Sequence, residues 1–225
     1  MKTMLKREWL LLLVIAAPFV FLAAVWPQIP ERIPIHFNAS FVPDGWMKKP
    51  WGALLLPLTS PLMVLITRLW FRFDPKMAKC DPETREHVGK VLHQVLVATC
   101  VLFGALSVAV IWAAWGDLHP VIAVINYGIP LMFLVVGNSM SKLRPNYTIG
   151  IRVPWTLESP VVWTKTHRFG GRLMVALGLG LLVAVCFGLE KAWYAWVLLA
   201  GIGVWAVAVI AYSFILSRRE TRIAM

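Results

Sequence analysis

Charged residues are scarce in this sequence, at 15% of 225 positions, whereas hydrophobic residues make up 59%. Soluble domains average about a quarter charged and about half apolar residues, so this composition excludes an ordinary soluble enzyme. Apolar runs of roughly twenty residues alternate with short charged segments, and each run is long enough to cross about 30 Å of hydrocarbon. The pattern predicts a protein that crosses a membrane several times.

Acidic residues are fewer still, at 11 against 22 Lys and Arg, which gives a formal net charge of +11. A nucleic-acid-binding protein would carry such a charge clustered on a soluble fold with a recognisable reading element. Here the cations lie between the apolar runs, which is how membrane topology is specified. We therefore expect the lipid bilayer to be a partner and direct nucleic acid binding to be absent.

Cysteine is also rare, and the three residues Cys80, Cys100 and Cys186 are widely separated. An odd number at these spacings predicts neither a disulfide framework nor a metal-ligand cluster. No HExxH, GxSxG or paired-carboxylate pattern occurs that would indicate a membrane enzyme. The sequence therefore predicts no catalytic residue, no metal site and no cofactor.

Six spans are expected, and the cations in their short connections set the orientation. With the N-terminus inside, only four of the 22 Lys and Arg residues lie outside, and these are Arg32, Lys48, Lys49 and Lys191. Cytoplasmic connections carry the excess of Lys and Arg, so the expected fold is an all-α polytopic membrane protein with cytoplasmic N- and C-termini. The expected spans are 9–27, 51–71, 91–115, 120–140, 172–189 and 192–216.

Polar residues inside the spans are few. No Asp, Glu or Lys is expected at mid-membrane, and Arg68 lies close enough to the inner end of its span to snorkel to the interface. Proline and glycine could break two helices, at 57–61 and at 126–130. Broken helices can line a transport path, but they are also tolerated as kinks. Along the fifth span, small residues every four positions from Ala176 to Gly188 predict close helix packing.

The first outer loop, residues 28–50, combines a weak strand signal with a turn signal at Pro43-Asp44-Gly45. It is long for a membrane connection, and loops on a rigid scaffold often carry binding residues. One interpretation is a docking surface for an extracellular ligand; the other is a structural loop held by its own hydrogen bonds. The candidate ligand-binding residues here are His36, Asn38, Asp44 and Trp46.

The second long connection, residues 141–171, faces the cytoplasm in this topology. Ser159-Pro160 is a good helix start, so we expect a short interfacial helix from 160 and a hinge at Gly170-Gly171. Clustered cations favour binding of a cytoplasmic partner or of anionic lipid, although topology determination alone also explains them. The candidate residues are Tyr147, Gly150, Arg152, Pro154, Trp155, Trp163, Lys165, His167 and Arg168.

Two stretches of the sequence resemble known families. The string from Tyr147 to Leu157, YTIGIRVPWTL, followed by VWTKTHRFGG from Val162 to Gly171, resembles the signature of the SdpI family of bacterial membrane proteins. The segment Ile33 to Asn38, followed by Pro43-Asp44-Gly45-Trp46, resembles the N-terminal domain of unknown function, DUF1648, that often precedes it. The resemblance covers nearly the whole chain with its flanking helices.

This resemblance implies a non-enzymatic protein of the bacterial inner membrane that gives immunity to a membrane-active peptide toxin. It also implies a cytoplasmic transcriptional repressor that is sequestered when toxin is bound. The alternative is a transporter or export component for a small molecule or peptide. The expected domains are an N-terminal two-helix unit at 1–71, a cytoplasmic linker at 72–90 and a four-helix membrane domain at 91–225.

Overall fold

The computed structural model describes residues 2–188 and 191–223, and it is almost entirely helical. Six helical segments are long and apolar enough to cross a membrane, as the sequence predicts. They are Glu8–Gln28, Trp51–Arg72, Pro82–Ala114, His119–Met140, Pro160–Cys186 and Trp193–Glu220. The fold class, an all-α polytopic membrane protein, is confirmed. Residue 189, where the fifth span is expected to end, lies outside the described residues.

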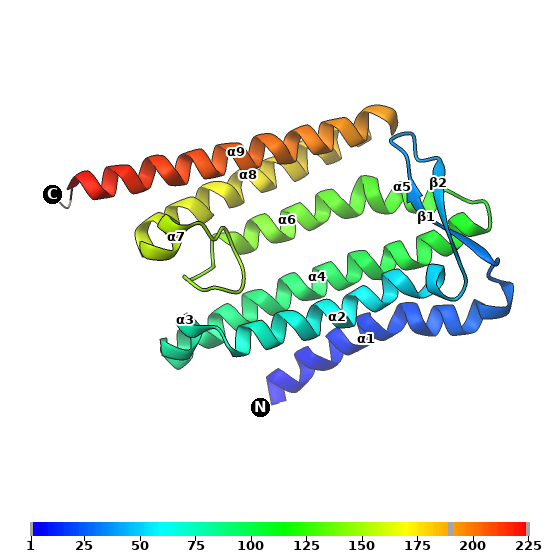
Figure 1. Ribbon diagram of the computed structural model, residues 1–225, viewed down its shortest axis with the longest axis horizontal. Coiled ribbons are helices and arrows are strands. Elements are labelled where there is room, and N and C mark those ends of the chain that lie inside the picture. Colours follow the sequence, from blue (N-terminus) through cyan, green and yellow to red (C-terminus); the bar gives the residue numbers. More distant parts are fainter. Residues whose placement is uncertain (1, 189–190, 224–225) are drawn as a thin grey trace.

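The long helices run lengthwise beside one another, so each connection lies at one of two ends (Figure 1). One end holds the two termini and the short helices α3 (Pro75–Lys79) and α7 (Pro154–Glu158). The other end holds a hairpin of β1 (Arg32–Phe37) and β2 (Pro43–Lys48) and the turn into α5 (His119–Ala123). Every connection that the cation pattern assigns to the cytoplasm therefore lies at one end, which we call the inner end. The hairpin lies at the outer end.

Three helices form the N-terminal part of the bundle. The first, α1 (Lys2–Val25), and the second, α2 (Trp51–Arg72), both pack on α4 (Pro82–Ala114). At the outer end their core includes Leu22, Ala53 and Ile111, and the hairpin joins it through Ile33, which is fully buried. Burying Ile33 fixes the hairpin on the bundle, because the apolar side chain leaves water only in that position.

Prolines do not break α2, although the sequence allowed for a break at 57–61. The helix is continuous from Trp51 to Arg72 with Pro57 and Pro61 inside it. Each proline removes one backbone hydrogen bond. The other peptide groups keep their helical hydrogen bonds, because lipid offers them no alternative partner. In the fourth span the backbone does depart from the α-helix, and a π-helical turn at Val124–Gly128 separates α5 from α6 (Ile129–Met140).

The fourth and fifth spans approach each other more closely than any other pair. A β-carbon on Gly171 would lie 2.5 Å from the carbonyl oxygen of Gly137, and one on Gly178 would lie 2.8 Å from that of Pro130. The expected hinge at Gly170-Gly171 is therefore wrong, since α8 runs unbroken from Pro160 to Cys186. These glycines instead permit close contact between the two helices. The short helix expected from residue 160 is part of α8, and the short helix at this end is α7.

Two further expectations about helices need correction. The helix α4 begins at Pro82, well inside the region expected to be a linker, because the Asp81 carboxylate accepts a hydrogen bond from the Thr84 amide and caps it. That bond holds the pKa of Asp81 below its usual range. The expected small-residue face is also wrong, since Ala176 and Gly180 are exposed and Gly180 has open space around it.

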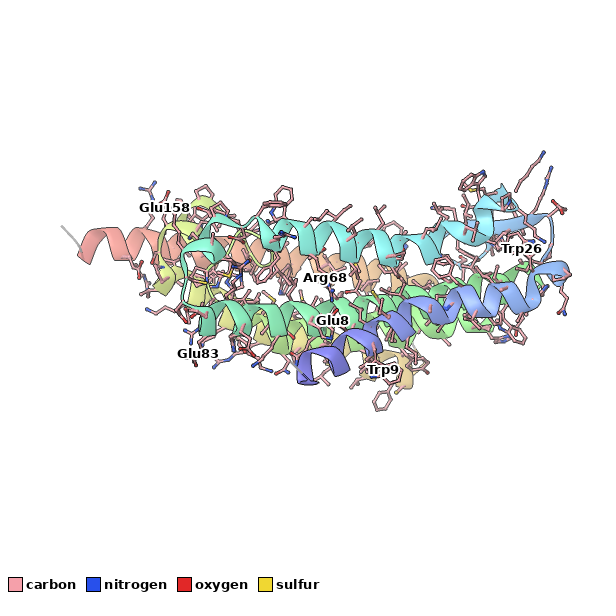
Figure 2. The ribbon with its side chains drawn as sticks, turned by 90° about the horizontal axis from the view of Figure 1, so that it is seen from below. Glu8, Trp9, Trp26, Arg68, Glu83 and Glu158 are labelled. Atoms are coloured by element: carbon pink, nitrogen blue, oxygen red, sulfur yellow. The ribbon has the colours of Figure 1, made fainter. Side chains whose placement is uncertain are left out.

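Exposed side chains on the bundle are mainly apolar, which suits contact with lipid. Tryptophans near span ends are among the most exposed, and Trp9, Trp51 and Trp70 are each at least 60% exposed. Such residues settle at membrane interfaces. Arg68 does not need to snorkel, because its guanidinium lies 2.6 Å from the Glu8 carboxylate of α1. Figure 2 shows the two side chains meeting between α1 and α2.

Candidate functional site

The outer hairpin is an antiparallel pair in which Ile33 lies opposite Met47 and Pro34 opposite Trp46. Its turn lies at residues 38–42, so the expected turn at Pro43-Asp44-Gly45 is wrong. The Asn38 side chain closes this turn by accepting hydrogen bonds from the Ser40 and Val42 amides at 2.9 and 3.0 Å. Phe41 adopts a left-handed φ of 60° there. Asn38 therefore has a structural role in shaping the turn.

Three of the candidate ligand-binding residues share the exposed side of the hairpin. His36 Nδ1 and the Asp44 carboxylate form a hydrogen bond of 2.5 Å across the strands, and His36 is 71% exposed. Trp46, two residues along the same strand from Asp44, is 51% exposed. A polar pair beside an exposed tryptophan is a surface suited to recognising an amphipathic molecule, since tryptophan offers both apolar area and a hydrogen-bond donor.

A cleft of about 390 Å³ adjoins the hairpin turn. It lies between Ser40–Val42 and the α4–α5 turn, and Asp117 and His119 line it. The hydrogen bond from His119 to the Asp117 side chain, at 2.9 Å, lowers the pKa of that carboxyl. The outer end thus carries two His–Asp pairs, His36–Asp44 on the hairpin and His119–Asp117 on the α4–α5 turn. The second pair was not among the residues singled out from the sequence.

At the inner end, residues 141–159 form a folded cap over the helix ends, which we call the inner cap. Its central tie is Asp74, which is 1% exposed and precedes α3. One carboxylate oxygen accepts from the Lys76 and Met77 amides at 2.9 and 3.2 Å. The other accepts from the Tyr147 amide at 2.7 Å and from the Thr148 hydroxyl at 2.8 Å. Asp74 therefore joins the end of α2 to residues 147–157 of the inner cap, which we call the signature segment.

Asn146 shapes the segment from within. Its side-chain oxygen accepts from the amides of Thr148 and Ile149 at 2.8 and 2.7 Å, and its nitrogen donates to the Arg144 carbonyl at 2.7 Å. The residue is fully buried. Because both polar atoms of this buried amide have partners, the side chain holds the turn in one conformation.

His167 and Trp163 anchor the next part of the cap to α8. The Ile151 amide donates to His167 Nε2 at 2.9 Å, and Nδ1 on the same ring donates to the Trp163 carbonyl at 2.8 Å. This pairing requires a neutral ring with its proton on Nδ1. The indole of Trp163 stacks on the imidazole at 4.0 Å between centroids and donates to the Leu143 carbonyl at 2.9 Å.

Gly150 passes directly over this stacked pair. Its φ is +125°, a conformation that other residues rarely adopt. A β-carbon there would lie 2.5 Å from His167 Nε2 and 3.1 Å from the Trp163 ring. The position therefore requires glycine on two independent grounds, backbone conformation and space.

The far side of the cap is fastened to α9 (Lys191–Ile223). Trp155 donates from its indole nitrogen to the Ser213 hydroxyl at 2.9 Å, and Ser159 donates to the Glu220 carboxylate at 2.6 Å. The buried Thr156 hydroxyl donates to the Ile151 carbonyl at 2.7 Å within α7 and its approach. On α4, His87 bonds the Lys142 carbonyl at 2.9 Å. The inner cap thus contacts α2, α4, α8 and α9.

Eight of the nine candidate inner residues divide into supports of the cap and exposed side chains; the ninth, Trp155, is half-buried and bonded to Ser213. Trp163 and His167 are at most 1% exposed, and Gly150 lies against them, so these three hold the cap in position. Arg152, Pro154, Lys165 and Arg168 are exposed, as is Tyr147 at 36%. Arg152 also donates to the Tyr147 carbonyl. A cytoplasmic partner would therefore meet the exposed group, and its binding to them stays a prediction.

Sequence reasoning missed Asp74, Asn146 and Thr156. Asp74-Pro75 is a recognisable helix start, but its bonds to Tyr147 and Thr148 join residues more than seventy positions apart, which no local pattern reveals. Among residues 2–188 and 191–223, no group of three or more His, Cys, Asp or Glu side chains could hold a metal ion.

The sidedness can be tested by cysteine labelling in a variant whose native cysteines are serine. We expect Ser40→Cys, at the exposed hairpin turn, to react with an impermeant maleimide on intact cells. We expect Glu158→Cys, exposed at the other end in Figure 2, to react only after permeabilisation. Labelling of position 158 from outside, with none at position 40, would reverse the orientation.

The arrangement defines a class: a multi-pass membrane protein with a folded loop at each end of a helical bundle. Residues 142–213 match the model of the SdpI/YfhL protein family, and residues 13–60 match the domain of unknown function DUF1648. The first match contains most of the inner cap, and the second contains the hairpin. The chain therefore carries an SdpI-type region at 142–213, preceded by a DUF1648-type region at 13–60.

One similar protein is Immunity protein SdpI of Bacillus subtilis (strain 168), with 22% identity over 175 residues. The match covers 77% of this chain and 79% of that protein. No solved structure matches.

Proposed function

We propose that this protein gives the bacterium that makes it immunity to a membrane-active peptide that arrives from outside. The observation that carries the proposal is the similarity to Immunity protein SdpI, which extends over most of both chains. In this proposal the protein is non-enzymatic and acts by binding. The exposed face of the hairpin, with His36, Asp44 and Trp46, is the candidate surface for the peptide.

The same proposal includes a signal to the cytoplasm. The helix α2 supports it, because it begins three residues after the end of the hairpin strand β2 and ends two residues before Asp74. At its outer start the backbone of Gly52 packs against Met47 and Ile33 of the hairpin. At its inner end Asp74 holds Tyr147 and Thr148. A shift of the hairpin would therefore be carried by one helix to the cap, where a cytoplasmic repressor would be held on the exposed cations.

Immunity predicts that expression in a sensitive bacterium raises the inhibitory concentration of at least one peptide in a panel of membrane-active peptides. We expect Trp46→Ala to remove most of this protection, because loss of a central aromatic anchor costs about 2 kcal/mol or more of binding, which is about thirtyfold in affinity. Trp193→Ala is the matched control, since Trp193 is 61% exposed, against 51% for Trp46, but lies at the start of another span. Both variants must reach the membrane at wild-type abundance.

Equal sensitivity with and without the protein across the panel would contradict immunity. Protection that survives Trp46→Ala unchanged would move the binding surface away from the hairpin. For the signalling part, we expect cross-linking from Arg168→Cys, on the exposed face of α8, to capture a cytoplasmic protein only in cells treated with the protecting peptide.

One observation favours transport as a second candidate. The side-chain oxygen of Asn126 is buried without a hydrogen-bond partner, and Asn126 lies in the π-helical turn of the fourth span. Such turns occur often at functional sites. Substrate flux into proteoliposomes that stops on Asn126→Ala would favour transport over immunity by binding.

A further inference from the structure

A groove of about 660 Å³ lies where the inner end of α2 meets the inner cap. Ile66, Leu69 and Trp70 of α2 line its length, and Phe73 and Tyr147 line the end nearest the cap. The volume falls within the range of small-molecule sites, about 300–1,000 Å³. No protein atoms occupy this volume, so the groove is open to a ligand.

The groove lies at the depth of the inner membrane interface. Trp70 is 60% exposed and Phe73 is 74% exposed, and tryptophan settles at the level of the lipid headgroups. Outward along α2, the apolar exposed face continues through Leu62 and Leu65, each 56% exposed. This face needs lipid around it, so the groove is continuous with the acyl region of the inner leaflet.

Cationic side chains flank the end nearest the cap, although the groove lining itself contains none. Asp74 lines the groove, but both of its oxygens are occupied by the four hydrogen bonds that hold the cap. The Lys76 ammonium lies 5.2 Å from the Tyr147 ring centroid and donates a hydrogen bond to the Leu157 carbonyl, which leaves further N–H donors on the same group. Arg72 is exposed in the last turn of α2, and Arg152 binds the Tyr147 carbonyl.

We infer that this groove binds one anionic phospholipid of the inner leaflet. An acyl chain lies along Ile66 and Leu69, and the phosphate faces Arg72 and Lys76. An apolar groove flanked at one end by Lys76 and Arg72 complements a molecule with an apolar tail and an anionic head, and cations near the cytoplasmic face favour such headgroups. The bound lipid contacts Tyr147 beside the Asp74 tie, so it stabilises the inner cap. This inference does not depend on the proposed immunity.

The test compares lipids on the purified full-length protein in detergent, with native mass spectrometry to count retained molecules. We expect phosphatidylglycerol to be retained at least tenfold better than phosphatidylcholine. Leu69→Trp fills the groove, and we expect it to lose this retention. Leu62→Trp, one heptad earlier on the same exposed face and outside the groove lining, is the matched control and keeps it.

A second variant separates headgroup from tail. The double substitution Arg72→Gln and Lys76→Gln removes both cations but keeps a donor for Leu157, so we expect the two lipids to bind equally and weakly. A photo-reactive amino acid at position 69 in living cells should acquire the mass of a lipid. Equal retention of both lipids by the wild type, unchanged retention in Leu69→Trp, or a cross-link from position 69 to a protein would each overturn the inference.

Discussion

Gly150→Ala is expected to destabilise the inner cap by about 3 kcal/mol or more, because it combines backbone strain with a severe clash. The new β-carbon would meet His167 Nε2 at 2.5 Å, on the nitrogen that accepts from Ile151. Moving the imidazole breaks that bond and disturbs its stacking on Trp163. The left-handed backbone at φ +125° is itself costly for alanine. All three effects act on one small region.

The measurement is the thermal unfolding midpoint of the purified protein in detergent, together with protease sensitivity of the cap. Gly180→Ala is the control, because Gly180 is exposed on α8 with nothing within 4 Å of the position of its β-carbon. Alanine favours helix over glycine by about 1 kcal/mol, so this variant should be as stable as the wild type or slightly more so. Equal midpoints for the two variants would show that Gly150 is not constrained as described.

The second large effect is expected from Asp74→Ala, which removes the acceptor of four hydrogen bonds at once. The amides of Tyr147, Lys76 and Met77 and the Thr148 hydroxyl all lose their partner. A buried donor left without a partner costs about 1–3 kcal/mol, so the total loss is about 3 kcal/mol or more even after some relaxation. The link between α2 and the signature segment is lost with it.

Two comparisons show whether the effect belongs to the buried position. Asp74→Asn keeps one side-chain oxygen and should lose less stability than Asp74→Ala. Asp81→Ala removes an exposed N-cap that accepts from Thr84 and should cost about 1 kcal/mol. Proteolysis between residues 141 and 153 should accelerate in Asp74→Ala and not in Asp81→Ala. Wild-type protease resistance in Asp74→Ala would mean that the other ties, through His167 and Ser213, hold the cap unaided.

Local patterns predicted the spans well but their ends less well. Long apolar runs define the spans because each must satisfy its own backbone in lipid. The start of α4 at Pro82 lies nine residues before the expected start at 91, since the charged first turns of the helix extend beyond the apolar run. The expected hinge at Gly170-Gly171 failed because glycine has two opposite uses in helices, flexibility and close approach. Contact with Gly137 on another helix decided between them.

The two candidate sites differ in how much the sequence revealed. His36, Asp44 and Trp46 were singled out because they lie in a long outer loop, and the structure places all three side chains at the exposed surface of the hairpin. In the inner cap the chosen residues do lie together, but their division into buried supports and exposed groups depends on the packing of α8 and α2. Nothing in the sequence around Trp163 distinguishes a buried anchor from an interfacial residue.

The sequence by itself determined the number of spans, the common end of the cation-rich connections and the resemblance of its two long loops to known families. These follow from hydrophobic length and charge placement, which act locally along the chain. Only the tertiary structure decided that Asp74 ties α2 to Tyr147 and Thr148, that Gly150 lies over His167, and that an apolar groove opens beside Tyr147. Those features join residues far apart in sequence, and they exist only once the helices have packed.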